Sequence, residues 1–344
     1  RRTMNLPLGT RQDDVAIGHS VKRKEDPKLL RGEGRYSDDI RLPGQAYAVM
    51  VRSQHAHGTI LSIDTGEARS MPGVLGVYTG KDLEAAGFGG LKCLVSIPSR
   101  DGGGIRQTPR TALAMDKVRY LGDPVAFVVA ETPAQARDAA EAVHVDIDPL
   151  PAVTDARAAL EAGAPIVYDE VPGNLALDFQ YGDSAKVEAA FASAAHVVRM
   201  DMANTRVVVN AMEPRSALAE YDADSGKWTL HAGSQGAFPL RNQIARDILK
   251  VEPEKLRILT GNVGGSFGMK AAAYPEYPCV LYAARELGRP VKWTADRSES
   301  FLSDAHGRDH VTRIELACDR DGTFRALRTV VLPLLKPAIV TALV

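Results

Sequence analysis

Two short segments of small residues could present backbone amides to an anionic ligand. The first, residues 228–239, predicts a strand, a tight loop at Gln235 and Gly236, and a helix with Pro239 in its first turn. Because the start of a helix carries partial positive charge, loop amides beside it can bind a negatively charged oxygen. Taken alone, the segment is more typical of an ordinary strand-to-helix turn with a solvated glutamine.

The second segment, residues 256–270, is an alternating strand pattern followed by a glycine-rich run. Four glycines fall within eight residues, namely Gly261, Gly264, Gly265 and Gly268. Glycines permit positive φ and lack a Cβ atom, so consecutive amides can point into a pocket and bind oxygen. The spacing fits neither the Walker loop nor the dinucleotide GxGxxG pattern, so a generic nucleotide-binding loop is the weakest alternative. A glycine-rich bulge or hairpin explains this segment equally well.

Other polar side chains are weaker candidates for chemistry. His55 and His57 could suggest a metal pair, but no third ligand lies near them in sequence. Glu213 could pair with Arg215, either beside a cofactor pocket or in a surface turn. The polar cluster at residues 304–310 predicts a solvated loop.

The elements around these segments form a mixed pattern without regular β-α alternation, which favours an α+β fold. In the first half, strands are expected at residues 46–52, 59–64, 74–79 and 125–130. Thr132, followed by Pro133 and Gln135, predicts a helix start. Three prolines in residues 148–165 indicate a connection between two domains, in line with a chain of 344 residues.

The second half predicts a similar mixture of elements. Asp183 is expected to cap one helix, and Gly288 is expected to end another that contains Cys279. Strands are expected at residues 196–202, 206–209, 217–221 and 228–232. The first 29 residues are polar and are expected to form an irregular N-terminal arm that packs on the surface.

Composition excludes several classes of partner. Lys and Arg total 42 against 43 Asp and Glu, a net charge of −1, so neither nucleic acid nor an acidic membrane surface is an expected partner. The cysteines, Cys93, Cys279 and Cys318, are too far apart to bind an iron–sulfur cluster, so any such cluster belongs to another chain. Without a signal-peptide pattern or a membrane span, a cytoplasmic location is expected.

Read together, the two loop segments and three further motifs have a family likeness. The chain resembles the molybdopterin-binding large subunit of the xanthine oxidase and aldehyde oxidase family, nearest to bacterial carbon monoxide dehydrogenase-like large chains. The resemblance runs from about residue 18 to about residue 327. Its motifs are KEDPKLLRGEGRY at residues 24–36, VRYLGDP at 118–124, MEPR at 212–215, SQ at 234–235 and VGGSFG at 263–268.

The resemblance implies a domain organisation. An N-terminal arm at residues 1–29 precedes an a/b hammerhead domain at 30–150, followed by a linker at 151–170 and the first part of a mixed α/β molybdopterin-binding domain at 171–328. Residues 329–344 do not follow the family pattern and are expected to be an atypical tail, from a frameshift or a fragment boundary.

The resemblance also implies which residues meet the cofactor. Gln235 would hydrogen-bond an oxo ligand of molybdenum, and loop amides would line the metal and pterin end of the pocket. The remaining expected cofactor-binding residues are Gly236, Gly264, Gly265, Ser266, Phe267 and Gly268. No side chain of this chain is expected to ligate the metal or act in catalysis, because the family's general-base glutamate would lie beyond residue 344. Ala271 stands where xanthine-type members carry a glutamate, which disfavours purine substrates.

The implied function is that of the large subunit of a molybdenum hydroxylase. Such an enzyme oxidises an aldehyde, an N-heterocycle or carbon monoxide with water as the oxygen source, using molybdenum–molybdopterin as the cytosine dinucleotide. Iron–sulfur clusters and FAD would belong to a small and a medium partner subunit, in a dimer of heterotrimers. The alternative is a truncated, non-catalytic chain that folds but retains no cofactor.

Overall fold

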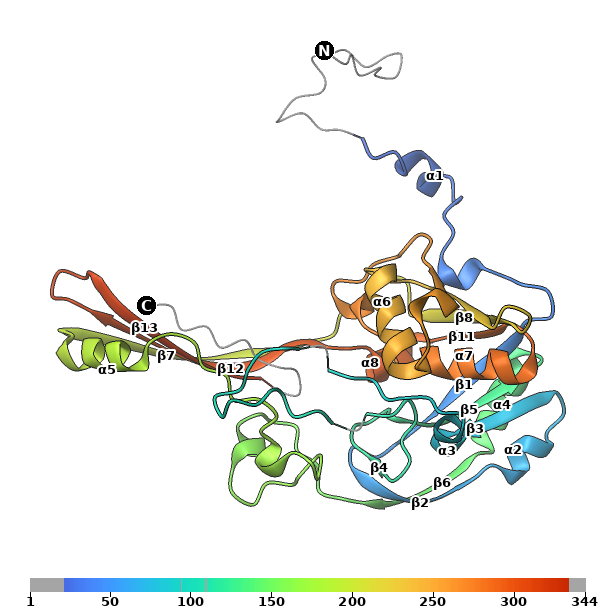
Figure 1. The fold of residues 1–344 in the computed structure, drawn as a ribbon, viewed down its shortest axis with the longest axis horizontal. Helices are drawn as coiled ribbons and strands as arrows, with labels where there is room; N and C mark the ends of the chain where they lie inside the picture. The colour runs from blue at the N-terminus through green and yellow to red at the C-terminus, as the bar shows by residue number, and fades with distance from the viewer. Residues whose placement is uncertain (1–21, 94, 109, 334–344) are drawn as a thin grey trace, which may run out of the picture.

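A computed structural model describes residues 22–93, 95–108 and 110–333. Its largest element is a seven-stranded mixed sheet with the strand order β10, β9, β8, β11, β1, β5, β3 (Figure 1). These strands are β1 (Ala46–Arg52), β3 (Val74–Thr79), β5 (Pro124–Ala130), β8 (Ser216–Asp222), β9 (Lys227–Ala232), β10 (Leu256–Leu259) and β11 (Val291–Thr294). The mixed α+β class expected from the sequence is confirmed.

One sheet runs through both halves of the sequence. β1 pairs antiparallel with β5 on one side and parallel with β11 on the other, with Ala46 opposite Val291. The first half therefore contributes one end of the sheet, and the residues from 216 onward contribute the other. The two domains expected on either side of residues 150–170 thus share a sheet, which sequence-local patterns do not reveal.

The first half wraps this sheet end with short helices and a second, three-stranded sheet. The second sheet has the order β4 (Lys117–Val118), β2 (Gly58–Asp64), β6 (His144–Pro149), and the helices are α2 (Gly66–Ser70), α3 (Gly80–Ala85) and α4 (Pro133–Glu141). Every residue of β5 is buried, since layers cover both of its faces. The expected cap of α4 is confirmed, because the Thr132 side chain accepts a hydrogen bond from the Gln135 amide.

Asp123 lies in the turn that leads into β5, and its charge should reduce stability at neutral pH. Burial raises the pKa of its carboxyl to about 6, although the Arg119 amide donates to it at 3.0 Å. Since this folded-state pKa exceeds the ordinary 3.8, the stabilising contribution of protonation is present below about pH 4 and lost as the pH rises through 6. Asp123→Asn should therefore raise the thermal midpoint by about 2–4 °C at pH 7.5 and leave it unchanged at pH 4.

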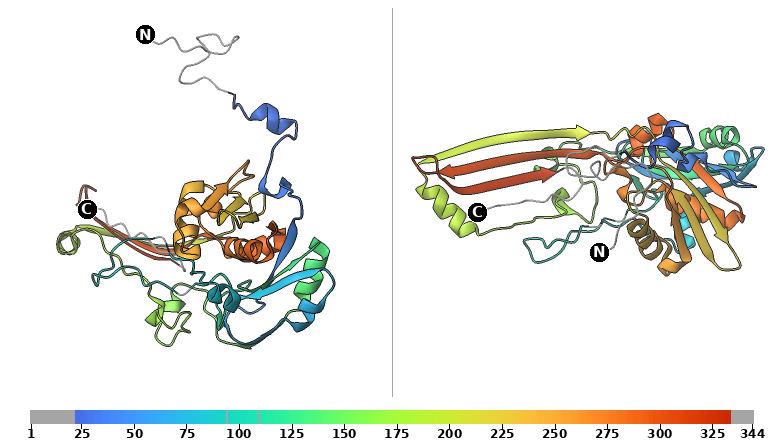
Figure 2. Two further views of the ribbon diagram at one scale, coloured as in Figure 1. Left: turned by 45° about the vertical axis from the view of Figure 1, so that its right-hand side comes forward. Right: turned by 90° about the horizontal axis from the view of Figure 1, so that it is seen from above.

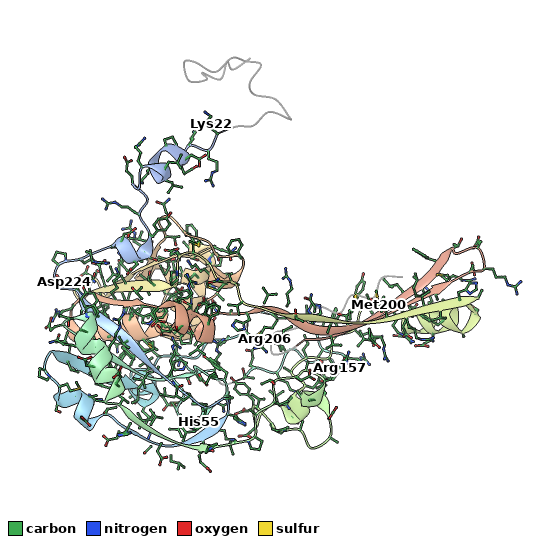
Figure 3. The ribbon with its side chains drawn as sticks, turned by 180° about the vertical axis from the view of Figure 1, so that it is seen from behind. Lys22, His55, Arg157, Met200, Arg206 and Asp224 are labelled. Atoms are coloured by element: carbon green, nitrogen blue, oxygen red, sulfur yellow. The ribbon has the colours of Figure 1, made fainter. Side chains whose placement is uncertain are left out.

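The matched control is Asp224→Asn at the exposed β8–β9 hairpin, labelled in Figure 3. Thermal melts at both pH values should show no change for this variant. A lower midpoint for Asp123→Asn at pH 7.5 would contradict the expectation.

Three helices of the second half pack around β8–β11. α7 (Glu276–Leu287) is buried along most of its length and ends at Gly288, which has φ +61°, as the sequence predicts. α6 (Ala237–Gln243) continues into a π-helical turn, Ile244–Leu249, and α8 (Arg297–Ser303) follows β11. Cys279 is fully buried and burial raises the pKa of its thiol, so it is a core residue as expected.

A long three-stranded ribbon extends away from the main sheet (Figures 1 and 2). Its order is β13 (Phe324–Pro333), β12 (Gly307–Cys318), β7 (His196–Val207). β7 contains the expected strand at residues 196–202 and part of the one expected at 206–209, so the expected break between them and the end at residue 209 are wrong. β12 pairs with β7 along the whole length of β7. The polar residues in the middle of β7 interrupt its apolar pattern, so the sequence did not indicate one continuous strand. Residues 329–333 of the expected tail belong to β13, and residues 334–344 lie outside the described residues.

The two faces of this ribbon differ. On one face, Glu315 forms ion pairs with Arg199 and Arg328, and α5 (Ser184–Ser193), capped by Asp183 as expected, packs beside them. Because side chains alternate along a strand, the opposite face of β7 carries another set of residues. That set is apolar and exposed, and consists of Val198, Met200 (labelled in Figure 3) and Met202.

The described part of the N-terminal arm contains a helix rather than an irregular segment. α1 (Asp26–Leu30) begins with Pro27 in its first turn and buries none of its residues, and Leu30 is 87% exposed. It stands off the body instead of packing on it (Figure 1). Residues 1–21 of the expected arm lie outside the described residues. Within the described ranges, no helix is long and apolar enough to cross a membrane.

Candidate cofactor-binding loops

The two candidate loops start from neighbouring strands. Gln235 follows β9 and the glycine run follows β10, and these two strands pair in parallel from Trp228–Leu256 to His231–Leu259. The carboxyl ends of parallel neighbours lie at the same edge of a sheet, so the loops that follow them meet there.

Hydrogen bonds join the two loops directly. The Ser266 hydroxyl donates to Gln235 Oε1 at 2.7 Å, and the Gln235 amide donates to the Lys270 carbonyl at 3.1 Å. The structure therefore brings Gln235 and the glycine run together.

The glycine run leaves a row of amides available for a ligand. Gly265, Phe267 and Gly268 have φ values of 100°, 49° and 95°, a left-handed conformation that is strained for Phe267. In the part of the chain that the structure describes, the amides of residues 265–268 donate to no protein acceptor. Successive amides in such a turn can converge on one anionic oxygen, and the exposed Phe267 side chain points away from the core.

Two of the expected amides are already used within the protein. The Gly236 amide donates to the Ser234 hydroxyl at 3.0 Å, and the Gly264 amide donates to Glu213 Oε2 at 2.8 Å. Gly264 is instead needed for close packing, because a Cβ there would lie 2.5 Å from the Glu213 Cβ. These two glycines shape the loops, and their amides are not free for a ligand.

A buried ion pair that sequence reasoning missed supports the glycine run. Lys270 Nζ lies 2.8 Å from Glu213 Oε2 and also donates to the Glu213 carbonyl, and the Lys270 side chain is 1% exposed. Glu213 Oε1 accepts a further hydrogen bond from the Ser37 hydroxyl at 3.2 Å. The expected pair of Glu213 with Arg215 is therefore wrong. The signal in the sequence for this pair was a lysine two residues after the last glycine of the run. The Gly264 amide binds Glu213, which brings the run and its lysine beside the MEPR segment.

Arg215 turns into the core instead. Its guanidinium lies 2.6 Å from both Glu276 and Asp304 and stacks on the Tyr274 ring at 3.7 Å. Asp304 is buried, so its placement in a solvated loop at residues 304–310 is wrong. Glu213 and Arg215, which are two residues apart in the MEPR segment, thus contact the candidate loop and the core, respectively.

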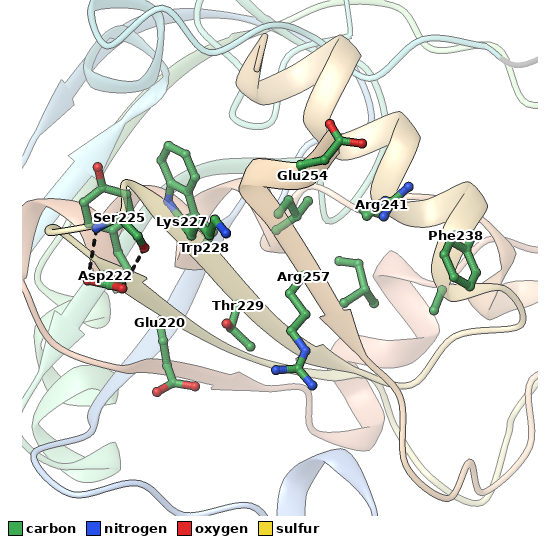
Figure 4. A pocket seen from close by; sticks show the side chains of 14 residues that line it. Glu220, Asp222, Ser225, Lys227, Trp228, Thr229, Phe238, Arg241, Glu254 and Arg257 are labelled. Atoms are coloured by element: carbon green, nitrogen blue, oxygen red, sulfur yellow. Dashed lines mark hydrogen bonds between the residues drawn. The ribbon is translucent and has the colours of Figure 1, made fainter. Parts of the chain in front are cut away.

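Other features of the surface do not join this site. The hollow in Figure 4 lies between β9, β10 and α6, and its lining includes Phe238, Arg241 and Arg257 but neither Gln235 nor Ser266. Among the described residues, no group of three His, Cys, Asp or Glu could hold a metal ion. His57 is buried and its Nδ1 bonds to the Pro151 carbonyl at 2.8 Å.

Comparisons with known families cover most of the described chain. Residues 31–151 match the family described as "Aldehyde oxidase and xanthine dehydrogenase, a/b hammerhead domain", and residues 167–333 match "Molybdopterin cofactor-binding domain". The chain belongs to this family of molybdopterin oxidoreductases. The family likeness drawn from the sequence motifs is confirmed, and so are the hammerhead and molybdopterin-binding parts of the fold.

Individual members of the family are similar to this chain over most of its length. The carbon monoxide dehydrogenase large chain of Afipia carboxidovorans is 34% identical, covering 92% of this chain and 39% of that protein. The nicotine 6-hydroxylase large subunit of Paenarthrobacter nicotinovorans is also 34% identical, covering 91% and 37%. The crystal structure of quinoline 2-oxidoreductase from Pseudomonas putida 86 has a TM-score of 0.83 at 36% identity, covering 92% and 39%. The chain thus spans about two fifths of the length of these family members.

Proposed function

We propose that this chain acts as the large, molybdenum-binding subunit of a molybdenum hydroxylase. The observation that carries the proposal is the meeting of Gln235 with the glycine run, where the amides of residues 265–268 have no acceptor among residues 22–93, 95–108 and 110–333. The substrate class is an aldehyde, an N-heterocycle or carbon monoxide. The family relatives named for carbon monoxide and for nicotine support this range.

The residues present suit a molybdenum–molybdopterin group. Backbone amides and a carboxamide donate hydrogen bonds to oxo and pterin oxygens without competing as metal ligands. Gln235, with the amides of Gly265, Ser266, Phe267 and Gly268, would hold the metal end of the group, in its cytosine dinucleotide form. The bound group supplies the two-electron oxidation of the substrate carbon, with water as the source of oxygen. This chain's own part is to hold and orient it.

Electron transfer is proposed to need partner chains. The three cysteines are far apart in sequence, and among the described residues no group of three His, Cys, Asp or Glu could hold a metal, so no iron–sulfur cluster is assigned to them. We propose an iron–sulfur small subunit and an FAD-binding medium subunit as partners, in a dimer of heterotrimers in the cytoplasm. One relative named as a large subunit and another named as subunit gamma of a dehydrogenase complex support an assembly of several chains.

Metal analysis tests the proposal. The chain is produced in a host that makes molybdopterin dinucleotide, purified, and analysed for molybdenum by mass spectrometry. Stoichiometric molybdenum is expected in the native chain. Gln235→Ala should retain about tenfold less, because it loses one hydrogen bond to the metal's oxygen ligand. A native chain that is folded by circular dichroism yet holds no molybdenum would overturn the proposal in favour of a non-catalytic chain.

A further inference from the structure

We propose that Ser266 is a positioning residue that fixes the Gln235 carboxamide with its Nε2 group outward. Gln235 is then able only to donate a hydrogen bond to whatever binds beside it. The inference deepens the proposed function and rests on it only in naming a metal-bound or anionic oxygen as the acceptor.

The first step is the direction of the bonds at the Ser266 hydroxyl. The Lys270 amide donates to Ser266 Oγ at 2.9 Å, and this amide proton can point nowhere else. The single hydroxyl proton is therefore free to be donated, and Gln235 Oε1 lies 2.7 Å away. Since Ser266 is 9% exposed, little water competes for that proton.

The second step excludes the flipped carboxamide. With Nε2 turned toward Ser266, the hydroxyl oxygen could accept from both N–H groups, but the hydroxyl proton would have no acceptor among the described residues. In the observed orientation each of these groups has a partner. The carboxamide oxygen is thus satisfied internally, and because Gln235 is an exposed residue, its two Nε2 protons are left for an external acceptor.

The third step is the rigidity of the ring of bonds. The Gln235 amide donates to the Lys270 carbonyl, the Lys270 amide donates to Ser266 Oγ, and Ser266 returns to the Gln235 side chain. Lys270 itself is held by the buried Glu213. The backbone and side chain of Gln235 are therefore fixed by the same residue pair, which orients the donor before any ligand arrives.

This orientation selects the chemistry of the bound group. A donor held in one direction stabilises an oxygen that carries negative charge and rejects a group that must itself donate a proton. An oxo or hydroxo oxygen fits, whereas an ammonium or a protonated ring nitrogen does not.

The test compares Ser266→Ala with Ser266→Thr, which keeps the hydroxyl. In protein labelled with ¹⁵N-glutamine, the Gln235 carboxamide signals are assigned by their loss in Gln235→Glu. The native chain and Ser266→Thr should give Nε2 signals displaced from those of a freely rotating glutamine side chain. Ser266→Ala should move them toward the free values, because the side chain then rotates, and its molybdenum content should fall about tenfold.

Ser234→Ala is the matched control. Ser234 is also 9% exposed, but its hydroxyl accepts from the Gly236 amide instead of contacting the carboxamide. This variant should leave the Gln235 signals unchanged. Ser266→Gly provides the same comparison should the alanine methyl group disturb folding.

The outcomes separate this inference from the proposed function. Unchanged Gln235 signals in both Ser266→Ala and Ser266→Gly would overturn the positioning role, even in a chain that holds molybdenum. Altered signals, restored by Ser266→Thr, in a chain without molybdenum would support the positioning role and refute the proposed function.

Discussion

Replacing Glu276 by glutamine is expected to destabilise the chain by about 3–5 kcal/mol, a large part of the 5–15 kcal/mol typical of a folded domain. Glu276 is fully buried, with Oε2 2.6 Å from Arg215 and Oε1 2.6 Å from Arg52. Glutamine would leave both guanidinium groups short of negative charge and would turn an amide N–H toward one of them. These contacts join α7 to β1 and to the start of β8, so the loss affects the centre of the molecule.

The control lies on the same helix. Glu286→Gln removes an ion pair with Arg285 at a site whose carboxyl is 41% exposed, and should change stability by less than about 0.5 kcal/mol. Urea unfolding followed by circular dichroism measures both variants. Equal midpoints for Glu276→Gln and the native chain would show that the buried network contributes nothing net.

The same carboxylate predicts a pH dependence. Burial alone would raise the pKa of Glu276, but Arg215 and Arg52 together lower it to about 2. Its folded-state pKa lies below the ordinary 4.5, so its contribution to stability is present above that value and is lost as the pH falls toward 2. The native chain should therefore lose more stability across this window than Glu276→Gln does.

The sequence predicts the local elements well because their signals are local. The alternation at residues 46–52, the cap at Thr132 and the left-handed Gly288 each depend on a few neighbouring residues, and each is found in the structure. The meeting of Gln235 with the glycine run was also predictable in outline. A strand signal preceded each loop, and a family motif covered both.

What the sequence did not predict depends on contacts distant along the chain. The parallel pairing of β1 with β11 joins Ala46 to Val291, and no local pattern specifies a partner 245 residues away. Glu213 is likewise 57 residues from Lys270. Proximity in sequence favoured Arg215 as the partner of Glu213, whereas burial decides the pairing, since a cation in the interior must lie beside a carboxylate.

The MEPR segment links the candidate loop to the core. Glu213 binds the Gly264 amide and Lys270, while Arg215 binds Glu276 and Asp304. The geometry of the free amides is therefore set by two buried networks that share one short segment. Changes to the loop network should alter ligand binding and stability together.

Lys270→Met is expected to show this coupling. Methionine fills a similar volume but leaves the Glu213 carboxylate, whose side chain is 9% exposed, without its cation. The cost should be about 3–5 kcal/mol, as for other buried charges that lose one partner. Amide hydrogen exchange should accelerate at Gly264 and at residue 270, whose amides donate to Glu213 and Ser266 in the native chain, because the anchor of the glycine run is gone. Molybdenum content should fall with it.

The double variant Glu213→Gln with Lys270→Met distinguishes the effect of an unpaired charge on stability from the effect of lost side-chain packing. Removing both charges should restore at least half of the lost stability, since the glutamine oxygen can still accept from the Gly264 amide and its Nε2 group can donate to the Ser37 hydroxyl oxygen. Lys227→Met, at an exposed lysine on β9, is the control for loss of a lysine and should be nearly neutral. Urea unfolding of the native chain, Glu213→Gln, Lys270→Met and the double variant gives the coupling energy. If the double variant is no more stable than Lys270→Met, an unpaired carboxylate is not the cause, and the support lies in the packing of the lysine side chain.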